Sequence, residues 1–302
     1  MQGSDMATPE AHTGIVVGVD GSAASAEAVR WAALEAGMRK LPLVVVHVRG
    51  TLPVGVAAMG FAVAPIPQEV FDWQIEHAQT VVDDAVDSVL AAEPRVRVRG
   101  EVICGSAVQT LIDLSKDAQM IVVGSRGLDA LQRGIFGSVS TGVVHHGHCP
   151  VAVVHEESRT GAPPANAPVL VGVDGSPASE LATAIAFDEA SWRGVDLIAL
   201  HAWSDNDMSG FPGTDRSAVI GAARETLAER LAGWRDRYPD VAVRPRIVLD
   251  HPARYLLDEA QTAQLVVVGS HGRGGFAGML LGSVSSAVLH AARIPVIVAR
   301  QP

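Results

Sequence analysis

The chain has 302 residues, of which 48% are hydrophobic and 19% are charged, and its formal net charge is −10. This length predicts about two domains, at roughly 100–200 residues each, and the apolar content excludes a disordered chain. The acidic charge argues against bulk binding of nucleic acid, because like charges repel a phosphate backbone. A pocket for a single nucleotide is still compatible with it, since backbone N–H groups can hold phosphate without net positive charge.

The cysteines and the first residues indicate a cytoplasmic protein. Cys104 and Cys149 are the two cysteines and form no C-x-x-C motif, which argues against a zinc site and favours a reducing compartment. Residues 1–13 are polar and lack the apolar run of a signal peptide. Residues 52–67 are apolar, but they are too few to span a membrane and are broken by proline and glycine. We expect a surface loop there.

Apolar runs alternate with helical patterns along the first half of the chain. Strands are predicted at about residues 14–20, 43–48, 96–103, 120–124 and 150–154. These runs are continuous, which is typical of strands buried on both faces of a parallel sheet. Ser22 and Ser106 are each placed to cap a helix, and residues 70–90 have helical periodicity. The helix after Ser22 is expected to end at about Gly37.

The second half of the chain repeats the landmarks of the first half in the same order. The matching runs are residues 14–22 and 168–176, 120–127 and 265–272, and 137–140 and 282–285. A unit near 150 residues indicates duplicated domains and not a solenoid. The βαβ alternation predicts two tandem, Rossmann-like α/β domains, each with a doubly wound parallel sheet of five strands. The predicted segments are a flexible tail at 1–13, a first α/β domain at 14–155, a linker at 156–167 and a second α/β domain at 168–302.

Each half contains a glycine loop after its fourth strand, with the pattern G-x-x-G, nine residues, then G-S. In open α/β sheets, ligands bind beyond the carboxyl ends of the strands. The glycines let the backbone approach an anion closely, and the final G-S opens a helix whose N–H groups suit a phosphate. For one such loop, phosphate binding and a purely structural role, as a tight strand-to-helix connection with a serine cap, are equally compatible with the sequence. Two loops with the same spacing favour phosphate binding.

An aspartate follows the first strand of each half, at Asp20 and Asp174. On physical grounds, capping of the next helix and contact with a ribose hydroxyl or Mg²⁺ are equally compatible with this position.

The runs Val-Gly-Val-Asp-Gly-Ser and Val-Val-Gly-Ser-x-Gly, followed by nine residues and Gly-Ser-Val-Ser, resemble the ATP-binding branch of the universal stress protein family. The tandem arrangement is similar to that of its two-domain members. The resemblance implies a strand order of 3-2-1-4-5, a cytoplasmic location and homodimerisation through the edges of the last strands. It also implies a regulatory role, with a protein partner, in survival of hypoxia, oxidative stress or dormancy.

By this resemblance, Asp20 and Asp174 lie by the adenosine end of ATP, and Ala107 and Pro252 open the helices beside the adenine. ATP is the expected ligand, Mg²⁺ is an optional companion, and no catalytic residue or protein metal ligand is predicted. The residues expected to bind ATP in the first domain are Gly18, Asp20, Ala107, Gly124, Ser125, Arg126, Gly127, Gly137, Ser138 and Val139. In the second domain they are Gly172, Asp174, Pro252, Val268, Gly269, Ser270, His271, Gly272, Arg273, Gly274, Gly282, Ser283 and Val284.

The two glycine loops differ in charge. The second loop continues with Arg273-Gly274, whereas the first has Leu128-Asp129 at that place. Asp129 puts a carboxylate near the expected phosphates, although Arg126 is available to offset it. We therefore hypothesise that the second site binds ATP more tightly than the first.

Other motifs in the chain are better explained by structure than by catalysis. The H-x-G-H motif of residues 145–148 matches a nucleotide-activating signature, but it ends the last helix of the first half, where histidines complement the helix dipole and Gly147 can act as a C-cap. The G-x-G-x-x-A run at 272–277 lacks the helix and the acidic residue of a dinucleotide-binding site, and no Walker lysine is present. His47 and His201 match between halves, and we expect core packing for both.

Three classes of function remain on the sequence alone. The first is an ATP-binding regulatory protein in which ATP acts as a conformational ligand. The second is a slow ATPase or adenylyl transferase, for which no water-activating group can be identified. The third is a nucleotide-independent interaction scaffold, against which the intact glycines argue. We expect the first, with no catalytic activity, no nucleic-acid partner and no membrane span.

Overall fold

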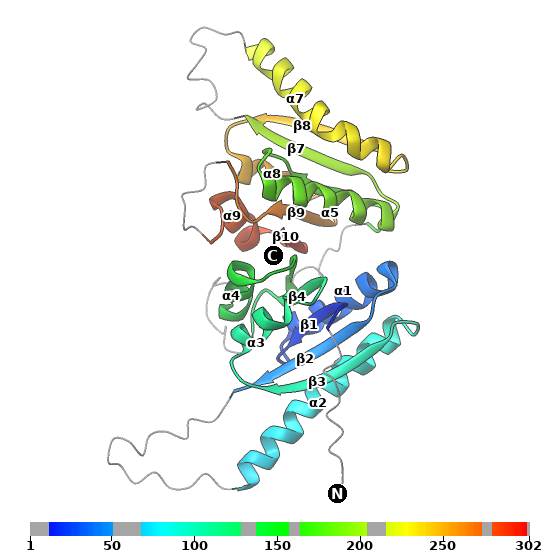
Figure 1. Cartoon of the computed structure of the whole chain (residues 1–302), viewed down its shortest axis with the longest axis vertical. Helices are drawn as coiled ribbons and strands as arrows, with labels where there is room; N and C mark the ends of the chain where they lie inside the picture. The colour runs from blue at the N-terminus through cyan, green and yellow to red at the C-terminus, as the bar shows by residue number, and fades with distance from the viewer. Residues whose placement is uncertain are drawn as a thin grey trace, which may run out of the picture.

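The computed structural model describes residues 12–50, 68–127, 137–156, 164–203, 216–273 and 280–300 (Figure 1). The predicted loop at 52–67, most of the tail and the comparison between Asp129 and Gly274 lie outside these residues. The first half contains β1 (Ile15–Val19), α1 (Ala23–Arg39), β2 (Leu43–Arg49), α2 (Gln68–Ala92), β3 (Val98–Cys104), α3 (Ala107–Leu114), β4 (Met120–Gly124), α4 (Ser138–His146) and β5 (Val151–Val154). The second contains β6 (Val169–Gly172), α5 (Pro177–Arg193), β7 (Leu197–Trp203), α7 (Arg216–Arg237), β8 (Val243–Leu249), α8 (Pro252–Ala260), β9 (Leu265–Gly269), α9 (Ser283–Ala291) and β10 (Val296–Ala299).

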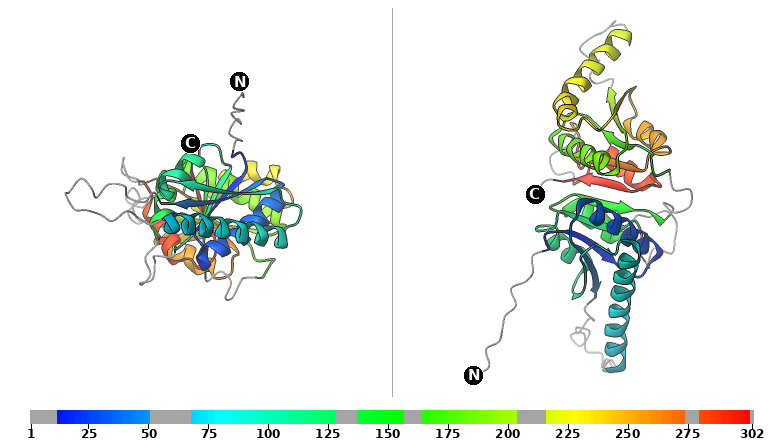
Figure 2. Two further views of the ribbon diagram at one scale, coloured as in Figure 1. Left: turned by 90° about the horizontal axis from the view of Figure 1, so that it is seen from below. Right: turned by 90° about the vertical axis from the view of Figure 1, so that its right-hand side faces the viewer.

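The ten strands of the described residues form one sheet in the order β3-β2-β1-β4-β5-β10-β9-β6-β7-β8. Within each half the order is 3-2-1-4-5 and every pairing is parallel, which confirms the predicted fold of each domain. The two halves join through β5 and β10, which pair antiparallel with Ala152 opposite Ile297. In Figure 2 these two strands lie side by side between the domains. The last-strand edges are therefore occupied within one chain, and the outer edges of the sheet are β3 and β8.

The helices cover both faces of this sheet, because each central strand is apolar on both sides. One core packs α1, α2, α5 and α7 against one face, and the other packs α3, α4, α8 and α9 against the opposite face. The strands β1, β4 and β5 are almost wholly buried, as their continuous valine and isoleucine runs predict. Both cores run across the β5–β10 junction, so the two domains share them.

The predicted helix caps are borne out at some positions and not at others. Ser22 caps α1 by accepting a hydrogen bond from the backbone N–H of Ser25. Ser106 occupies the same position before α3, but its side chain makes no capping hydrogen bond, so that prediction of side-chain capping is wrong. Gly147 is the C-cap of α4, and its backbone N–H donates to Val143 O at 2.8 Å.

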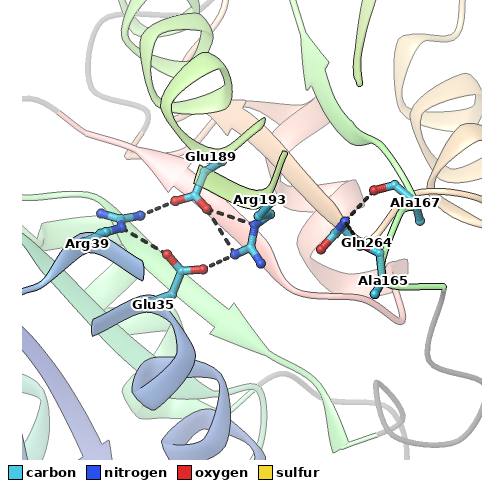
Figure 3. A network of polar contacts seen from close by, with 7 residues as sticks. All are labelled: Glu35, Arg39, Ala165, Ala167, Glu189, Arg193 and Gln264. Carbon is cyan, nitrogen blue, oxygen red and sulfur yellow. Dashed lines mark hydrogen bonds and ion pairs between the residues drawn. The ribbon is translucent and has the colours of Figure 1, made fainter. Parts of the chain in front are cut away.

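Four charged side chains cross the boundary between the domains at the α1–α5 contact (Figure 3). Glu35 and Arg39 come from α1, and Glu189 and Arg193 are their counterparts on α5. Each carboxylate accepts from the arginine of its own helix and from the arginine of the other helix. Both glutamates are fully buried, and the Arg39 guanidinium lies 4.6 Å from the ring centroid of Trp192. We call these four residues the interdomain tetrad.

The end of the predicted linker is fastened to the second domain. The side-chain amide of Gln264 donates to Ala165 O at 3.1 Å and also to Ala167 O at 2.5 Å. Figure 3 shows these contacts beside the tetrad. Residues 157–163 of the linker lie outside the described part of the chain.

Candidate functional site

The glycine loops and the aspartates of each half meet at the carboxyl edge of the sheet. In the first half, β1 lies between β2 and β4, and the chain passes from one face of the sheet to the other between these strands. The same reversal places β6 between β7 and β9 in the second half. Such a reversal leaves a crevice beyond the strand ends, which is where ligands bind in open α/β sheets.

In both halves the aspartate after the first strand contacts the glycine loop. The Asp20 Oδ1 accepts from the Ser22 backbone N–H at 3.0 Å, and a Cβ added at Gly127 would lie 2.6 Å from Asp20 Oδ2. Glycine at position 127 is therefore required for the carboxylate to approach the loop. The sequence left two roles open for Asp20, capping of the next helix and contact with a ligand. In the structure its carboxylate lies both at the start of α1 and against the glycine loop.

The second half repeats this contact. The Asp174 Oδ1 accepts from the Ser176 N–H at 2.9 Å, and a Cβ at Gly272 would lie 2.5 Å from Asp174 Oδ2. The same Oδ2 also accepts from the backbone N–H of Arg273 at 3.1 Å. Asp174 therefore holds the start of the glycine loop in the second domain.

The helices that follow the glycine loops begin without side-chain caps. Gly137 and Gly282 are the N-caps of α4 and α9, and neither helix has a side-chain capping hydrogen bond. Backbone hydrogen bonds join the two described ends of each loop, from Gly137 N–H to Ser125 O at 2.9 Å and from Gly282 N–H to Ser270 O at 2.7 Å. The first-turn N–H groups of such a helix start, together with the positive end of the helix dipole, suit an anion.

Two predicted glycines in each half have a packing role that the structure explains. A Cβ at Gly124 would lie 2.8 Å from the backbone carbon of Ala24, and one at Gly269 would lie 2.8 Å from that of Ala178. These glycines let the first turns of α1 and α5 approach the ends of β4 and β9. Gly18 and its counterpart Gly172 lie against a leucine of α3 and α8, respectively.

The other predicted residues surround the same crevice or support it from below. Ser125 and Ser270 are buried, and their backbone N–H groups donate to the last strands at 2.8 and 3.0 Å. Val268 is buried in the core, so its side chain is not available to a ligand. Ala107 and Pro252 are the first residues of α3 and α8. Gly274 lies outside the described residues.

An open pocket of about 540 Å³ lies between the N-terminal ends of α8 and α9. It is lined by Asp250, His251, Pro252, Ala253, Arg254, Ser283 and Val284. Pro252 and Ser283 thus line one pocket. Asp250 and His251 have positive φ values of 56° and 49°, which is unusual for residues with side chains.

Several charged residues near the second site were not predicted from the sequence. Arg254 of the pocket has Gln109 as its counterpart in α3. The guanidinium of Arg230, from α7, lies on the turn at Gly175, whereas Val81 of α2 lies at the matching Gly21. Arg230 also pairs with Glu180 at 3.1 Å. The segment between β2 and α2 is longer than the segment between β7 and α7. The residue of α7 that corresponds to a given residue of α2 could therefore not be deduced from the sequence alone.

His47 of β2 and His201 of β7 each contact the carboxyl end of the neighbouring first strand of their own half. The Nδ1 atoms lie 2.9 Å from Val19 O for His47 and 2.7 Å from Val173 O for His201. Because a carbonyl only accepts, Nδ1 carries the proton in both rings. His201 is fully buried, and burial lowers its pKa, with Arg273 and Arg230 lowering it further. The core packing expected from the sequence holds for His201, whereas His47 is half-buried.

The H-x-G-H motif ends α4, far from the start of that helix, as predicted. Burial lowers the pKa of His145, and the neighbouring His146 lowers it further. Within the described residues, no group of three or more histidine, cysteine, aspartate or glutamate side chains could hold a metal ion. The described helices also include none that is long and apolar enough to cross a membrane.

Comparison with known proteins assigns the family. The profile described as the universal stress protein family matches twice, at residues 13–155 and 166–300. The chain is similar to universal stress protein Rv2005c of Mycobacterium tuberculosis, with 52% identity over 98% of this chain and 100% of that protein. It is also 50% identical to universal stress protein Rv2623 of the same organism, over 98% of this chain and 99% of the relative.

A solved structure shows the same fold over nearly the whole chain. The crystal structure of a universal stress protein from Archaeoglobus fulgidus covers 96% of this chain and 99% of its own, with a TM-score of 0.68 and 20% identity. The repeated profile match, the full-length relatives and the duplicated 3-2-1-4-5 sheet agree. The chain is a tandem-domain member of the universal stress protein family.

Proposed function

We propose that this protein is a regulatory ATP-binding protein in which each domain holds one ATP and ATP acts as a conformational ligand. The observation that carries the proposal is the contact between the aspartate and the glycine loop in both halves. It supplies a glycine-lined backbone next to an uncapped helix start, which is an arrangement that suits phosphate. In this proposal the aspartate accepts a hydrogen bond from a ribose hydroxyl.

The pocket of the second domain supports the orientation of the nucleotide. Pro252 and Ala253 give its α8 side an apolar surface for a base, and Ser283 opens α9 on the opposite side. Arg254 adds positive charge at the pocket wall. The base would then lie towards α8 and the phosphates towards α9.

We further propose that the second site binds ATP more tightly than the first. Arg254 lies at the second pocket where the first half has Gln109, and the second loop has Arg273-Gly274 in sequence where the first has Leu128-Asp129. Additional positive charge favours a polyanionic ligand. If Mg²⁺ accompanies the ATP, phosphate oxygens and water would supply most of its ligands.

ATP is proposed here as a ligand and not as a substrate. The residues at the helix starts are glycine, serine and valine, whose side chains do not ionise near neutral pH. A cytoplasmic location is proposed from the free thiols of Cys104 and Cys149. A homodimer and a protein partner stay predictions, and a dimer built on sheet edges would have to use β3 or β8, since β5 and β10 pair with each other.

The direct test is to denature the purified protein, collect the released small molecules and identify them by mass. We expect ATP, and protein stripped of nucleotide should bind added ATP again. A single-turnover assay with labelled ATP should then show no release of phosphate beyond that of a buffer control. Rebinding of ATP with rapid hydrolysis would replace the regulatory proposal with an enzymatic one, and failure to bind ATP would reject both.

A further inference from the structure

The two domains exchange a reciprocal pair of hydrogen bonds on the α4–α9 side of their junction. His155 follows β5, and its Nε2 lies 3.1 Å from Leu289 O in the last turns of α9. Arg300 follows β10, and its guanidinium donates to Val144 O in the last turns of α4 at 2.5 Å. His155 and Arg300 occupy matching positions in the two halves, as do Val144 and Leu289.

The residue before each of these side chains is hydrogen-bonded through its backbone to the glycine loop of the same domain. Val154, which precedes His155, accepts a hydrogen bond from the Ser125 N–H at 2.8 Å. Ala299, which precedes Arg300, accepts from the Ser270 N–H at 3.0 Å. Ser125 and Ser270 directly follow the first glycines of the two loops. A change at either loop therefore reaches the last strand through one backbone hydrogen bond.

Each hydrogen bond also ends on the helix that opens the other site. Leu289 belongs to α9, whose first turn faces the second site, and Val144 belongs to α4, whose first turn faces the first site. Both helices have nine residues, so a constraint on the last turn acts on the whole helix. Arg300 in addition donates to Leu280 O at 3.3 Å, two residues before the N-cap Gly282.

The His155 link is shielded from water, and the hydrogen bond from Arg300 to Val144 is partly shielded, so solvent does not readily replace either of them. His155 is 8% exposed. Burial lowers the pKa of Arg300, although this arginine keeps its charge at neutral pH. Because the carbonyls can only accept, His155 Nε2 and the Arg300 guanidinium are the donors. Loss of either donor would leave a carbonyl near a helix end without its partner, and α4 or α9 would be held less firmly.

We infer that His155 and Arg300 are positioning residues that couple the two nucleotide sites, so that occupation of one site increases the affinity of the other. This inference rests on the proposed binding of ATP. Ligand at one glycine loop fixes the end of its last strand, and the linking side chain then holds the helix that forms the other site. Binding of the second ligand then costs less conformational entropy, because its site is already partly ordered. This is positive cooperativity.

The test needs a separate probe for each site. Val139 and Val284 are the second residues of α4 and α9, so their labelled methyl groups report occupancy of the first and the second site in an NMR titration with ATP. In a chain with both links intact, blocking the second site with Gly272→Glu should raise the ATP concentration at the midpoint of the Val139 titration by about fivefold. This is at the low end of measured couplings. In a chain that also carries Arg300→Met and His155→Leu, the same block should leave the Val139 midpoint unchanged.

A matched control separates the links from general damage to the junction. Arg39→Lys alters the tetrad on the opposite face of the sheet and does not touch either link. This variant should keep the fivefold effect, and its loss there would show that coupling depends on domain orientation and would overturn the inference. If Arg300→Met does not fold, His155→Leu alone tests the first link, with reduced coupling expected.

The possible failures can be told apart. An equal Val139 midpoint with and without Gly272→Glu in the otherwise unmodified chain, or a fivefold effect that survives loss of both links, would overturn the coupling while leaving ATP binding intact. Absence of any shift at both Val139 and Val284 on addition of ATP would instead reject the proposed function.

Discussion

Asp174 accepts a hydrogen bond from the backbone N–H of Arg273 at 3.1 Å, so the end of the first strand in the second domain is joined to the glycine loop of the same domain. Gly272 lies between them in space, because a Cβ there would come within 2.5 Å of the carboxylate. In the first domain the matching carboxylate of Asp20 lies against Gly127. The geometry of the proposed site thus depends on one glycine in each half.

Replacing Gly272 by glutamate should remove ATP from the second site, because the new side chain would displace Asp174 and add negative charge beside the phosphates. We expect the tighter binding event to weaken at least tenfold, which corresponds to about 1.4 kcal/mol. Gly127→Glu should remove the weaker event instead. Isothermal titration of both variants measures this, and equal losses from the two changes would contradict the proposed difference between the sites.

The matched control for this pair is Gly233→Ala in α7, where an added Cβ meets no atom within 4 Å. Its ATP affinity should equal that of the unmodified protein. Its free energy of unfolding should rise by about 0.5–1 kcal/mol, because alanine is the better helix former.

Gly269 is expected to matter for stability even without a ligand. An alanine there would place its Cβ 2.8 Å from the backbone carbon of Ala178 and 2.9 Å from the backbone nitrogen of Ser179, and neither can move without shifting α5. We expect Gly269→Ala to lower the free energy of unfolding by about 1–3 kcal/mol. Gly172→Ala should cost less, since its Cβ would meet a flexible leucine side chain at 3.3 Å. Urea unfolding of the nucleotide-free variants compares the two, and a smaller loss for Gly269→Ala would contradict this explanation.

The fold of each domain could be predicted because its signals are local. The continuous apolar runs at β1 and β4 required strands covered on both faces, and the repeated landmarks required two copies. The antiparallel pairing of β5 with β10 could not be predicted, because the same edges pair equally well between chains. One signal was available, since Glu35 and Arg39 recur as Glu189 and Arg193, but i,i+4 pairs of this kind are common on solvated helices.

The candidate site was predicted unevenly for a similar reason. Positions defined by backbone needs, such as Gly127 beside Asp20, follow from spacing after a buried strand. The positions of Arg230 and Arg254 depend on how α7 and α8 are registered against the sheet, which no short motif fixes. The packing role of Gly269 could not be predicted either. Close approach of a ligand and close approach of a neighbouring helix both require a residue without a side chain, so the sequence does not distinguish them.

The tetrad should make stability depend on pH. Burial, with the nearby charge of Glu189, raises the pKa of Glu35 from 4.5 to about 7. The folded protein therefore holds this proton more tightly than the unfolded chain, and stability from this group is fully present below pH 4.5 and is lost as the pH rises through 7. We expect a loss on the order of 2 kcal/mol between pH 5 and pH 8. Glu35→Gln should flatten this part of the profile in urea unfolding, and an unchanged slope would contradict the assignment.

The two cysteines should differ in reactivity. Cys104 is exposed, whereas Cys149 is buried, and burial raises the pKa of the Cys149 thiol to about 12. Because the thiolate is the reactive form, an alkylating reagent should modify Cys104 alone in the native protein at neutral pH. Modification of Cys149 should require unfolding. Mass spectrometry after timed alkylation, with and without urea, gives the sites, and rapid native labelling of Cys149 would show that its surroundings open readily.

The number of ATP molecules bound per chain tests the central claim most directly. Nucleotide-free protein should be titrated with ATP by calorimetry, alongside the Gly127→Glu and Gly272→Glu variants and the chain that carries both changes. The account predicts two ATP per unmodified chain, one for each single variant and none for the double variant. Absence of binding to the unmodified chain, or binding that survives in the double variant, would contradict it.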